Sequence, residues 1–398
     1  MQTTNKRIQT IDGMRGLSLF GILVANMLIF QYGMWGKDEI DFFSLSKVDL
    51  VGLEFIKILV EGSFMPIFTF LFGYGMIKMK HSLVNKGKKV KRHFARRALF
   101  LLVIGILHST FLWEGDILMF YGIMGFFLLL FLKRKKKTML IWGVALFVLT
   151  PFLGYGNLEE TARERDVLES YVVESIDVYA TGGYSEILSF RNGEVPLILP
   201  EYAYVIILLL SPLLSAPLFL FGMYAAENNL FTQPKEEAFL YKIGALTLVP
   251  VGILLKSSDL LSFSKNWVGV ADLLGANLLA LGYICSFGLL YVYAGNSSLL
   301  RGFEAVGKLS FTNYLMQTVI CTTIYYGYGL GQFGKLGVLN GFFVCIGIYF
   351  IQYVVSKWYL SHFKTGPFEK VIRVWTYLSF KGRVKENKAV NLPKEITV

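Results

Sequence analysis

One histidine of this sequence lies inside an apolar segment, where it could act as a base. His108 belongs to the stretch GILHSTFLWEGDILMFYG, whereas the other three histidines lie in or beside basic segments. Imidazole is the usual general base near neutral pH. Trp113, Glu114 and Asp116 follow closely, and a carboxylate beside an imidazole can orient the ring. The pattern favours a catalytic pair and a structural histidine equally.

A second group of polar residues opens the first apolar stretch, RIQTIDGMRGLSLFGILVAN. Asp12 and Arg15 are three residues apart, so they lie on one side of a helix and can pair. Gly16 would let another backbone come close. Asn26 lies about 15 Å further along the helix, toward its external half. A polar group in lipid needs a cause, and an anchor with one interhelical hydrogen bond is as compatible with this spacing as a functional site.

Two further pairs of polar residues are spaced four apart. Asn313 and Gln317 would share one side of a helix, where they either join helices or line a cavity. Lys57 and Glu61 could form an ion pair at the start of the second apolar stretch, where Pro66 would kink a helix that contains it. For this second pair, a structural and a functional role are equally compatible with the spacing.

All of these residues belong to a chain dominated by long apolar stretches. Hydrophobic residues make up 54% of its 398 residues and charged residues 17%, against about 25% charged in a soluble domain. The stretches lie near residues 14–31, 55–77, 97–114, 116–132, 138–156, 200–224, 239–257, 268–294, 306–326 and 337–360. Each is close to the roughly 20 residues that cross a bilayer as a helix. The sequence therefore predicts an all-α, polytopic membrane bundle of about ten transmembrane helices.

Basic residues gather in alternate connecting segments. Lysine and arginine are dense in the segments 78–97 and 133–137 and after Trp358, whereas the loops 32–54, 154–199, 258–267 and 327–336 carry few cations or balance them with acids. The positive-inside rule then predicts that both termini are cytoplasmic. The same rule explains the net charge of +11, and no motif indicates a nucleic-acid partner.

The three cysteines of the chain do not indicate a metal site. Cys285, Cys321 and Cys345 each lie within an apolar stretch. Their number is odd and their spacing is not that of metal ligands. We expect no metal, and we interpret these residues as small apolar side chains in helix packing.

The segment 157–199 differs from the rest of the chain. Its apolar residues recur among acids and arginines with the spacing of an amphipathic helix that ends at Gly182–Gly183. A helix lying on the membrane is favoured over a lid above an external cleft. The predicted organisation is a five-helix membrane region (1–156), this external segment (157–199), a second five-helix membrane region (200–378) and a flexible basic cytoplasmic tail (379–398).

Five motifs resemble those of a known family. They are RIQTIDGMRGLSLFGILVAN, FMPIFTFLFGYG, GILHSTFLWEGDILMFYGIMG, GKLSFTNYLMQTVICTTIYYGYGLGQFG and WYLSHFKTGPFEKVIRVWTY. They span nearly the whole chain in the order seen in the YeiB-like family, also called domain of unknown function 418. That family is similar to a wider group of transmembrane acyltransferases. The resemblance implies a ten-helix bundle in a bacterial plasma membrane, which moves an acyl group from cytoplasmic acyl-CoA or acetyl-CoA to an external or membrane acceptor.

Acyl transfer needs a base, an oxyanion donor and an anchor for phosphates. His108 would be the base or acyl carrier, oriented by Asp116 or Glu114, and Asn26 would donate to the oxyanion. Asn313 and Gln317 are the alternatives to Asn26 as oxyanion donor. Arg7, Arg15 and the cations around Lys91–Arg97 would hold the phosphates of coenzyme A, and Asp12 and Trp113 are further candidates for substrate or cofactor binding. The chain departs from the wider group at one point. The sugar-modifying branch has a histidine at the position of Asn26 and the lysosomal branch has one shortly after it, whereas here none occurs between Asn26 and His81.

Two other classes of function use the same residues differently. A transporter or flippase for a small amphipathic or lipid-linked solute would have the same polar cavity without any chemistry. A non-catalytic scaffold would depend on its surface loops and not on a cavity. The expected partners are the lipid bilayer and, for the enzyme, a surface sugar, a lipid or a small-molecule acceptor, and a homodimer stays open.

Overall fold

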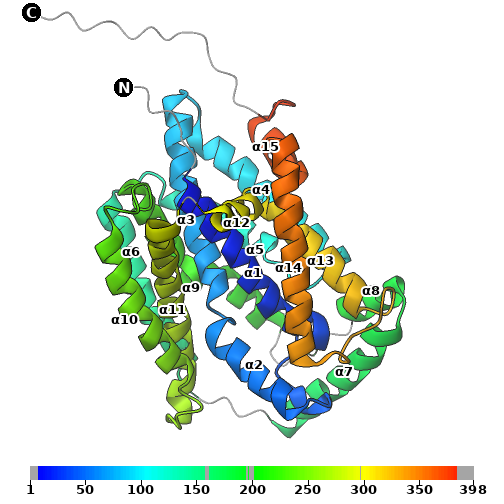
Figure 1. The fold of residues 1–398 in the computed structure, drawn as a ribbon. Helices are drawn as coiled ribbons and strands as arrows, with labels where there is room; N and C mark the ends of the chain where they lie inside the picture. The colour runs from blue at the N-terminus through cyan, green and yellow to red at the C-terminus, as the bar shows by residue number, and fades with distance from the viewer. Residues whose placement is uncertain (1–7, 157–160, 194–195, 197–200, 296, 383–398) are drawn as a thin grey trace, which may run out of the picture.

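The computed structural model describes residues 8–156, 161–193, 196, 201–295 and 297–382, and every regular element in these ranges is a helix. Eight helical segments in this part of the chain are long and apolar enough to cross a membrane. They are α1 (Gln9–Tyr32), α2 (Lys47–Leu59) continued by α3 (Phe64–Asn85), α4 (Val90–Phe111), α6 (Lys136–Leu149) with the short helix η3 (Thr150–Gly154), α9 (Glu201–Glu227), α10 (Ala238–Lys256), α11 (Lys265–Ala294) and α14 (Gly337–His362). The predicted helical membrane bundle is confirmed (Figure 1).

Two of the ten predicted stretches form shorter helices. The stretch 116–132 contains α5 (Leu118–Phe127) and η2 (Leu128–Leu130). The stretch 306–326 contains the end of α12 (Ser298–Lys308) and α13 (Ser310–Tyr325). Both α5 and α13 are shorter than the roughly 20 residues of a full crossing. Four polar residues of α13 are buried and meet protein and not lipid: Asn313, Gln317, Thr318 and Thr322.

The second predicted stretch, 55–77, is not one continuous helix. The chain leaves α2 at Val60 and enters α3 at Phe64, with Gly62 at a φ of 72° that glycine adopts easily. Pro66 therefore lies in the first turn of α3, where its missing N–H costs little, and the expected kink within a helix is wrong. Glu61 pairs with Lys37 at 2.8 Å and not with Lys57, so the expected ion pair is also wrong.

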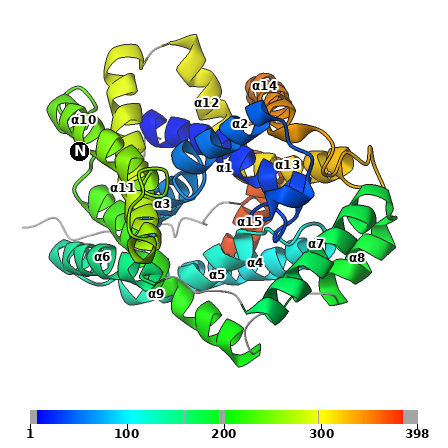
Figure 2. The same ribbon diagram turned by 90° about the horizontal axis from the view of Figure 1, so that it is seen from below.

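The two ends of the bundle differ in character. We call one the basic end, formed by the segments 86–89, 131–135 and 228–237 and by the start of α1. Hydrogen bonds tie it together, from Lys136 to Asn228 at 2.8 Å and from Lys78 to Asn229 at 2.9 Å. The other is the capped end, named for α7 (Ala162–Thr181) and α8 (Tyr184–Gly193), which lie along one side of it next to the end of α4 (Figure 2).

Helix α7 is the amphipathic helix expected from the sequence. Thr161 and Glu164 form a capping box at its start, and it ends at Gly182 as predicted. Leu168, Val172 and Tyr179 on its apolar side are buried against protein. These three residues attach α7 to the bundle, whereas Val167 and Val173 of the same helix are 44% and 55% exposed. The expected position of α7 on the membrane stays a prediction.

Helix α1 packs directly against α12 through two glycines. A Cβ atom at Gly16 would overlap the carbonyl of Phe303, and one at Gly307 would overlap the carbonyl of Asp12. The predicted close approach at Gly16 is confirmed, and small residues allow the two backbones to touch. This contact joins the two membrane regions of the chain into one core and fixes Asp12 in its interior.

Candidate functional site

A cavity of about 540 Å³ runs into the bundle from the basic end. The N-terminal half of α1, the middle and end of α3, α4 and α13 line it, and α15 (Pro367–Tyr377) contributes one wall. Its charged residues are five cations and two acids. They are Arg15, Lys78, Arg97, Lys308 and Arg373, with Asp12 and Glu369. The lining therefore has an excess of positive charge.

Three of these cations are arginines from three different helices. Arg97 lies close enough to Arg15 and Arg373 for their charges to repel one another. Arg15 also contacts Asp12 at 3.3 Å, which confirms the predicted pair on α1. Guanidinium groups match phosphate and carboxylate in a bidentate manner. A cluster of like charges in a cavity favours an anionic ligand, which would relieve the repulsion.

Glu369, one of the two acids of the cavity, also binds the start of α13 through its carboxylate. The backbone N–H groups of Phe311 and Thr312 donate to it at 2.9 and 3.1 Å, and the Thr312 hydroxyl donates at 2.6 Å. These are N–H groups of the first turn of α13, which have no partner within the helix. Glu369 therefore caps α13, and the cavity keeps an excess of positive charge because five cations face two acids.

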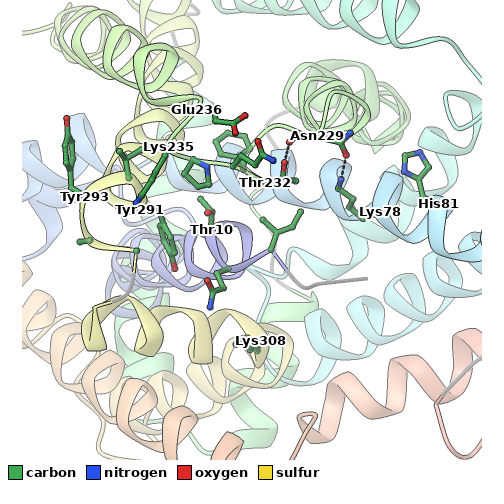
Figure 3. A pocket seen from close by; sticks show the side chains of 18 of the residues that line it. Thr10, Lys78, His81, Asn229, Thr232, Lys235, Glu236, Tyr291, Tyr293 and Lys308 are labelled. Carbon is green, nitrogen blue, oxygen red and sulfur yellow. Dashed lines mark hydrogen bonds between the residues drawn. The ribbon is translucent and has the colours of Figure 1, made fainter. Parts of the chain in front are cut away.

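A wider opening of about 1690 Å³ adjoins the cavity at the basic end (Figure 3). Lys78, Ser82 and Lys308 line both spaces, so the two are neighbours. In Figure 3, Lys78 bonds to Asn229 and His81 follows on the same helix. We call this opening the vestibule, and it provides an approach to the cavity from the basic end.

The vestibule wall contains strained backbone. Asn229 and Phe231 have φ values of 56° and 67°, a region that costs residues other than glycine about 1–3 kcal/mol each. Lys78 holds the side chain of Asn229, and the Tyr74 hydroxyl donates to the carbonyl of Leu230 at 2.7 Å. The shape of this wall is therefore imposed by contacts with α3.

The inner end of the cavity is closed by aromatic residues. Tyr121 and Tyr314 line it with Ile117, whose backbone N–H donates to the Tyr314 hydroxyl at 3.2 Å. The Tyr314 ring lies 5.7 Å from the imidazole of His108. His108 is 3% exposed and does not line the cavity. Tyr314 therefore separates the histidine from the cavity.

His108 is held from both ring nitrogens. Its Nδ1 lies 2.9 Å from Asp116 Oδ1, although the two are not aligned as a hydrogen bond, and its Nε2 lies 3.1 Å from the Thr318 hydroxyl. The other oxygen of Asp116 accepts from the Met119 N–H at 2.8 Å. The structure thus brings Asp116 to His108, as the sequence indicated, and their catalytic role stays a prediction.

Glu114 contacts the cap, whereas Trp113 packs on α1. The Tyr179 hydroxyl donates to Glu114 at 3.0 Å, and Arg191 lies 3.6 Å from the same carboxylate. Burial raises the pKa of Glu114, and the charge of Arg191 opposes that shift. Trp113 is fully buried and stacks on Phe30 with a centroid distance of 4.1 Å. These two residues attach the α4–α5 turn to its neighbours, and neither lines the cavity.

The amides predicted as oxyanion donors lie elsewhere. Asn313 donates to the Val306 carbonyl at 3.2 Å and to Ser356 at 3.0 Å, and Gln317 donates to Gln352 at 2.9 Å. These bonds join α13 to its neighbours, so the helix-joining interpretation holds for both residues. Asn26 is half-buried on α1 and does not line the cavity. Arg7 lies outside the described residues.

Several cavity residues were missed from the sequence. Arg373 belongs to the basic segment after Trp358 whose charge was explained by membrane topology, and Lys308 lies inside the predicted apolar stretch 306–326. Tyr121 and Tyr314 are two among 22 tyrosines. The only local signal is the spacing of Glu369 and Arg373, which are four residues apart and so share one side of a helix.

Comparison with known proteins places this fold among bacterial relatives. Residues 225–379 match the family described as "Protein of unknown function (DUF418)". Uncharacterized protein YxaH of Bacillus subtilis (strain 168) is 33% identical over 97% of this chain and 98% of its own length. Uncharacterized protein YeiB of Escherichia coli (strain K12) is 25% identical over 93% of this chain and 96% of its own length. No solved structure matches the chain. The chain therefore belongs to the YeiB-like family of membrane proteins, domain of unknown function 418.

Proposed function

We propose that this protein is a membrane acyltransferase, which takes an acyl group from acyl-CoA at a cytoplasmic basic end and passes it to an external or membrane acceptor. One observation carries the proposal. A cavity rich in cations leads from the basic end to Tyr314, and His108 with Asp116 lies directly behind that ring. This cavity would lead a polyanionic donor toward a candidate base.

The residues of the cavity fit coenzyme A by charge and by polarity. Arg15, Arg97 and Arg373 would hold its phosphates. Further in, Leu19, Phe68, Phe72 and other apolar side chains line the walls and suit an acyl chain. A volume of about 540 Å³ falls within the roughly 300–1,000 Å³ of small-molecule sites. The vestibule adds room for the nucleotide part of the donor.

The chemistry then assigns a role to each group near Tyr314. Coenzyme A supplies an acyl thioester. His108 accepts the proton of the acceptor hydroxyl or amine as its oxygen or nitrogen bonds to the acyl carbon, the C–S bond breaks, and the thiolate leaves and takes up the proton. Asp116 orients the imidazole and stabilises its charged form. Because Tyr314 closes the cavity, its side chain must turn aside for the reacting groups to meet.

Binding of coenzyme A to detergent-purified protein, measured by native mass spectrometry and calorimetry, is the first test. We expect the unmodified protein to bind it and the Arg97→Gln variant to bind it weakly, whereas Lys137→Gln, on the surface at the same end, serves as the control. Transfer of labelled acetyl groups from acetyl-CoA to a membrane extract tests the reaction. An unmodified protein that binds no coenzyme A would remove the proposal, and solute movement in proteoliposomes without an acyl donor would favour transport.

A further inference from the structure

Helix α15 presents three different sides along its length. Ile372 and Thr376 are buried against the bundle, Arg373 is exposed where the helix borders the cavity, and Lys370 is exposed on a polar side. The third side is apolar and exposed. Its residues are Phe368, Val371, Trp375 and Leu378, which are 39%, 49%, 44% and 66% exposed. Spacings of three and four place Phe368, Val371 and Trp375 on one side of the helix, and Leu378 follows directly after its end.

The buried side of α15 forms a wall of the cavity. Glu369, Ile372 and Arg373 line the cavity, and Glu369 also caps α13 through three hydrogen bonds. Any movement of α15 away from the bundle would therefore open this wall and carry Arg373 away from Arg97. The position of α15 decides the shape of the cavity at the basic end.

The apolar side of α15 continues a lipid-facing surface of α4. The Trp375 indole N–H donates to the Arg96 carbonyl at 2.9 Å, and its ring lies 6.1 Å from that of Phe100. Leu99 and Val103 of α4 follow Arg96 by three and seven residues and are 43% and 44% exposed. On a membrane helix, exposed apolar residues face lipid. The four apolar residues of α15 therefore extend that surface at the basic end, where a tryptophan is typical of the membrane interface.

Exposed lysines surround this apolar side. Lys364 precedes α15, Lys370 lies on it and Lys381 follows it, and all three are exposed. An amphipathic helix with lysines beside an apolar side is the pattern that lies in a membrane interface and attracts anionic lipid. Positive charge next to an apolar side matches the headgroup phosphate and acyl chain of one anionic phospholipid.

We propose that α15 lies in the inner-leaflet interface and that anionic phospholipids bound by Lys364, Lys370 and Lys381 hold it against the cavity. The partner is thus the anionic cytoplasmic leaflet, and the basic end faces it under the predicted topology. The lipid would set how far the cavity opens, whichever molecule the cavity takes. The inference is independent of acyl transfer, because its test measures only where α15 lies.

A probe at Val371 tests the position of the helix. In a background where the three cysteines are replaced by alanine, Val371→Cys carries an environment-sensitive fluorophore, and the protein is placed in nanodiscs. We expect blue-shifted emission that nitroxide-labelled lipids quench and aqueous iodide does not. The control is Lys137→Cys, exposed at the same end, which iodide should quench. If iodide quenches the Val371 probe as readily as the control, α15 does not lie in the membrane interface, and its apolar side would instead bind a protein partner.

The lipid charge is tested in the same system. Nanodiscs of phosphatidylcholine are compared with nanodiscs that also contain phosphatidylglycerol, and the blue shift should be larger in the anionic mixture. Replacing the three lysines by glutamine should remove that difference, since each lysine near such a surface contributes about fivefold in affinity. Equal emission in both mixtures would refute the role of anionic lipid even where the helix is membrane-bound.

Discussion

The two ends of the bundle use their polar residues in opposite ways. At the basic end, Arg15, Arg97 and Arg373 converge on a cavity whose five cations outnumber its two acids. At the capped end, Glu114 meets Tyr179 and Arg191, which tie its turn to α7 and α8. Charge that is concentrated around a cavity invites a ligand, whereas charge that is matched within the protein stabilises a contact. In a membrane protein, the balance of charge around a polar group therefore indicates its purpose better than its residue type does.

The largest expected effect is at His108, in the last turn of α4. His108→Ala should lower the rate of acyl transfer about 10²- to 10⁴-fold, the range for a general base, because no imidazole remains to accept the proton of the acceptor. Coenzyme A binding should persist, since His108 does not line the cavity. The measurements are transfer of labelled acetyl groups and calorimetric binding, with His362→Ala, exposed at the end of α14, as the control. Full activity in His108→Ala would show that the histidine is structural.

The next effect tests the concentration of charge at the basic end. Arg97→Gln should weaken coenzyme A binding about 10- to 100-fold, the value of one hydrogen bond to a charged group. The same change should leave the thermal stability of the empty protein unchanged or raise it, because it relieves repulsion from Arg15 and Arg373. A loss of stability without a loss of binding would mean that Arg97 is a structural residue like those of the capped end.

A smaller effect separates capping from ligand binding at Glu369. Glu369→Ala should destabilise the protein by about 1 kcal/mol, the usual cost of losing a helix cap, because two N–H groups of α13 lose their acceptor. Thermal unfolding in detergent measures it, and Asp166→Asn on the exposed side of α7 provides a matched loss of one carboxylate. If the two variants unfold at the same temperature, the contact between α15 and α13 contributes nothing to stability.

The smallest effect is the pH dependence of the capped end. Burial raises the pKa of Glu114, so the folded protein holds this proton more tightly than the unfolded chain does. Stability from this group is therefore present below the ordinary pKa of a glutamate and is lost as the pH rises above it. Thermal unfolding should show a small gain on moving from neutral pH toward that value, and Glu114→Gln should reduce the trend. An identical trend in the variant would assign it to other groups.

The amino-acid sequence by itself determined the features that depend on neighbours along the chain. Stretches of about 20 apolar residues predict membrane helices because the bilayer has a set thickness. A spacing of three residues predicted the Asp12–Arg15 pair, and the pattern before Gly182 predicted α7, because both follow from the geometry of one helix. The break at Gly62 escaped prediction, since Lys37 and α11 hold it from outside the stretch.

Only the tertiary structure decided which polar side chains share a space. Nothing local links Arg15, Arg97 and Arg373, which lie on three helices far apart in the chain and share a space only because α1, α4 and α15 line one cavity. The same packing turned Asn313 and Gln317 away from the cavity and into bonds between helices. Helix formation is governed by the residues of one segment, whereas the meeting of side chains depends on how separate segments pack, and local spacing carries no information about that.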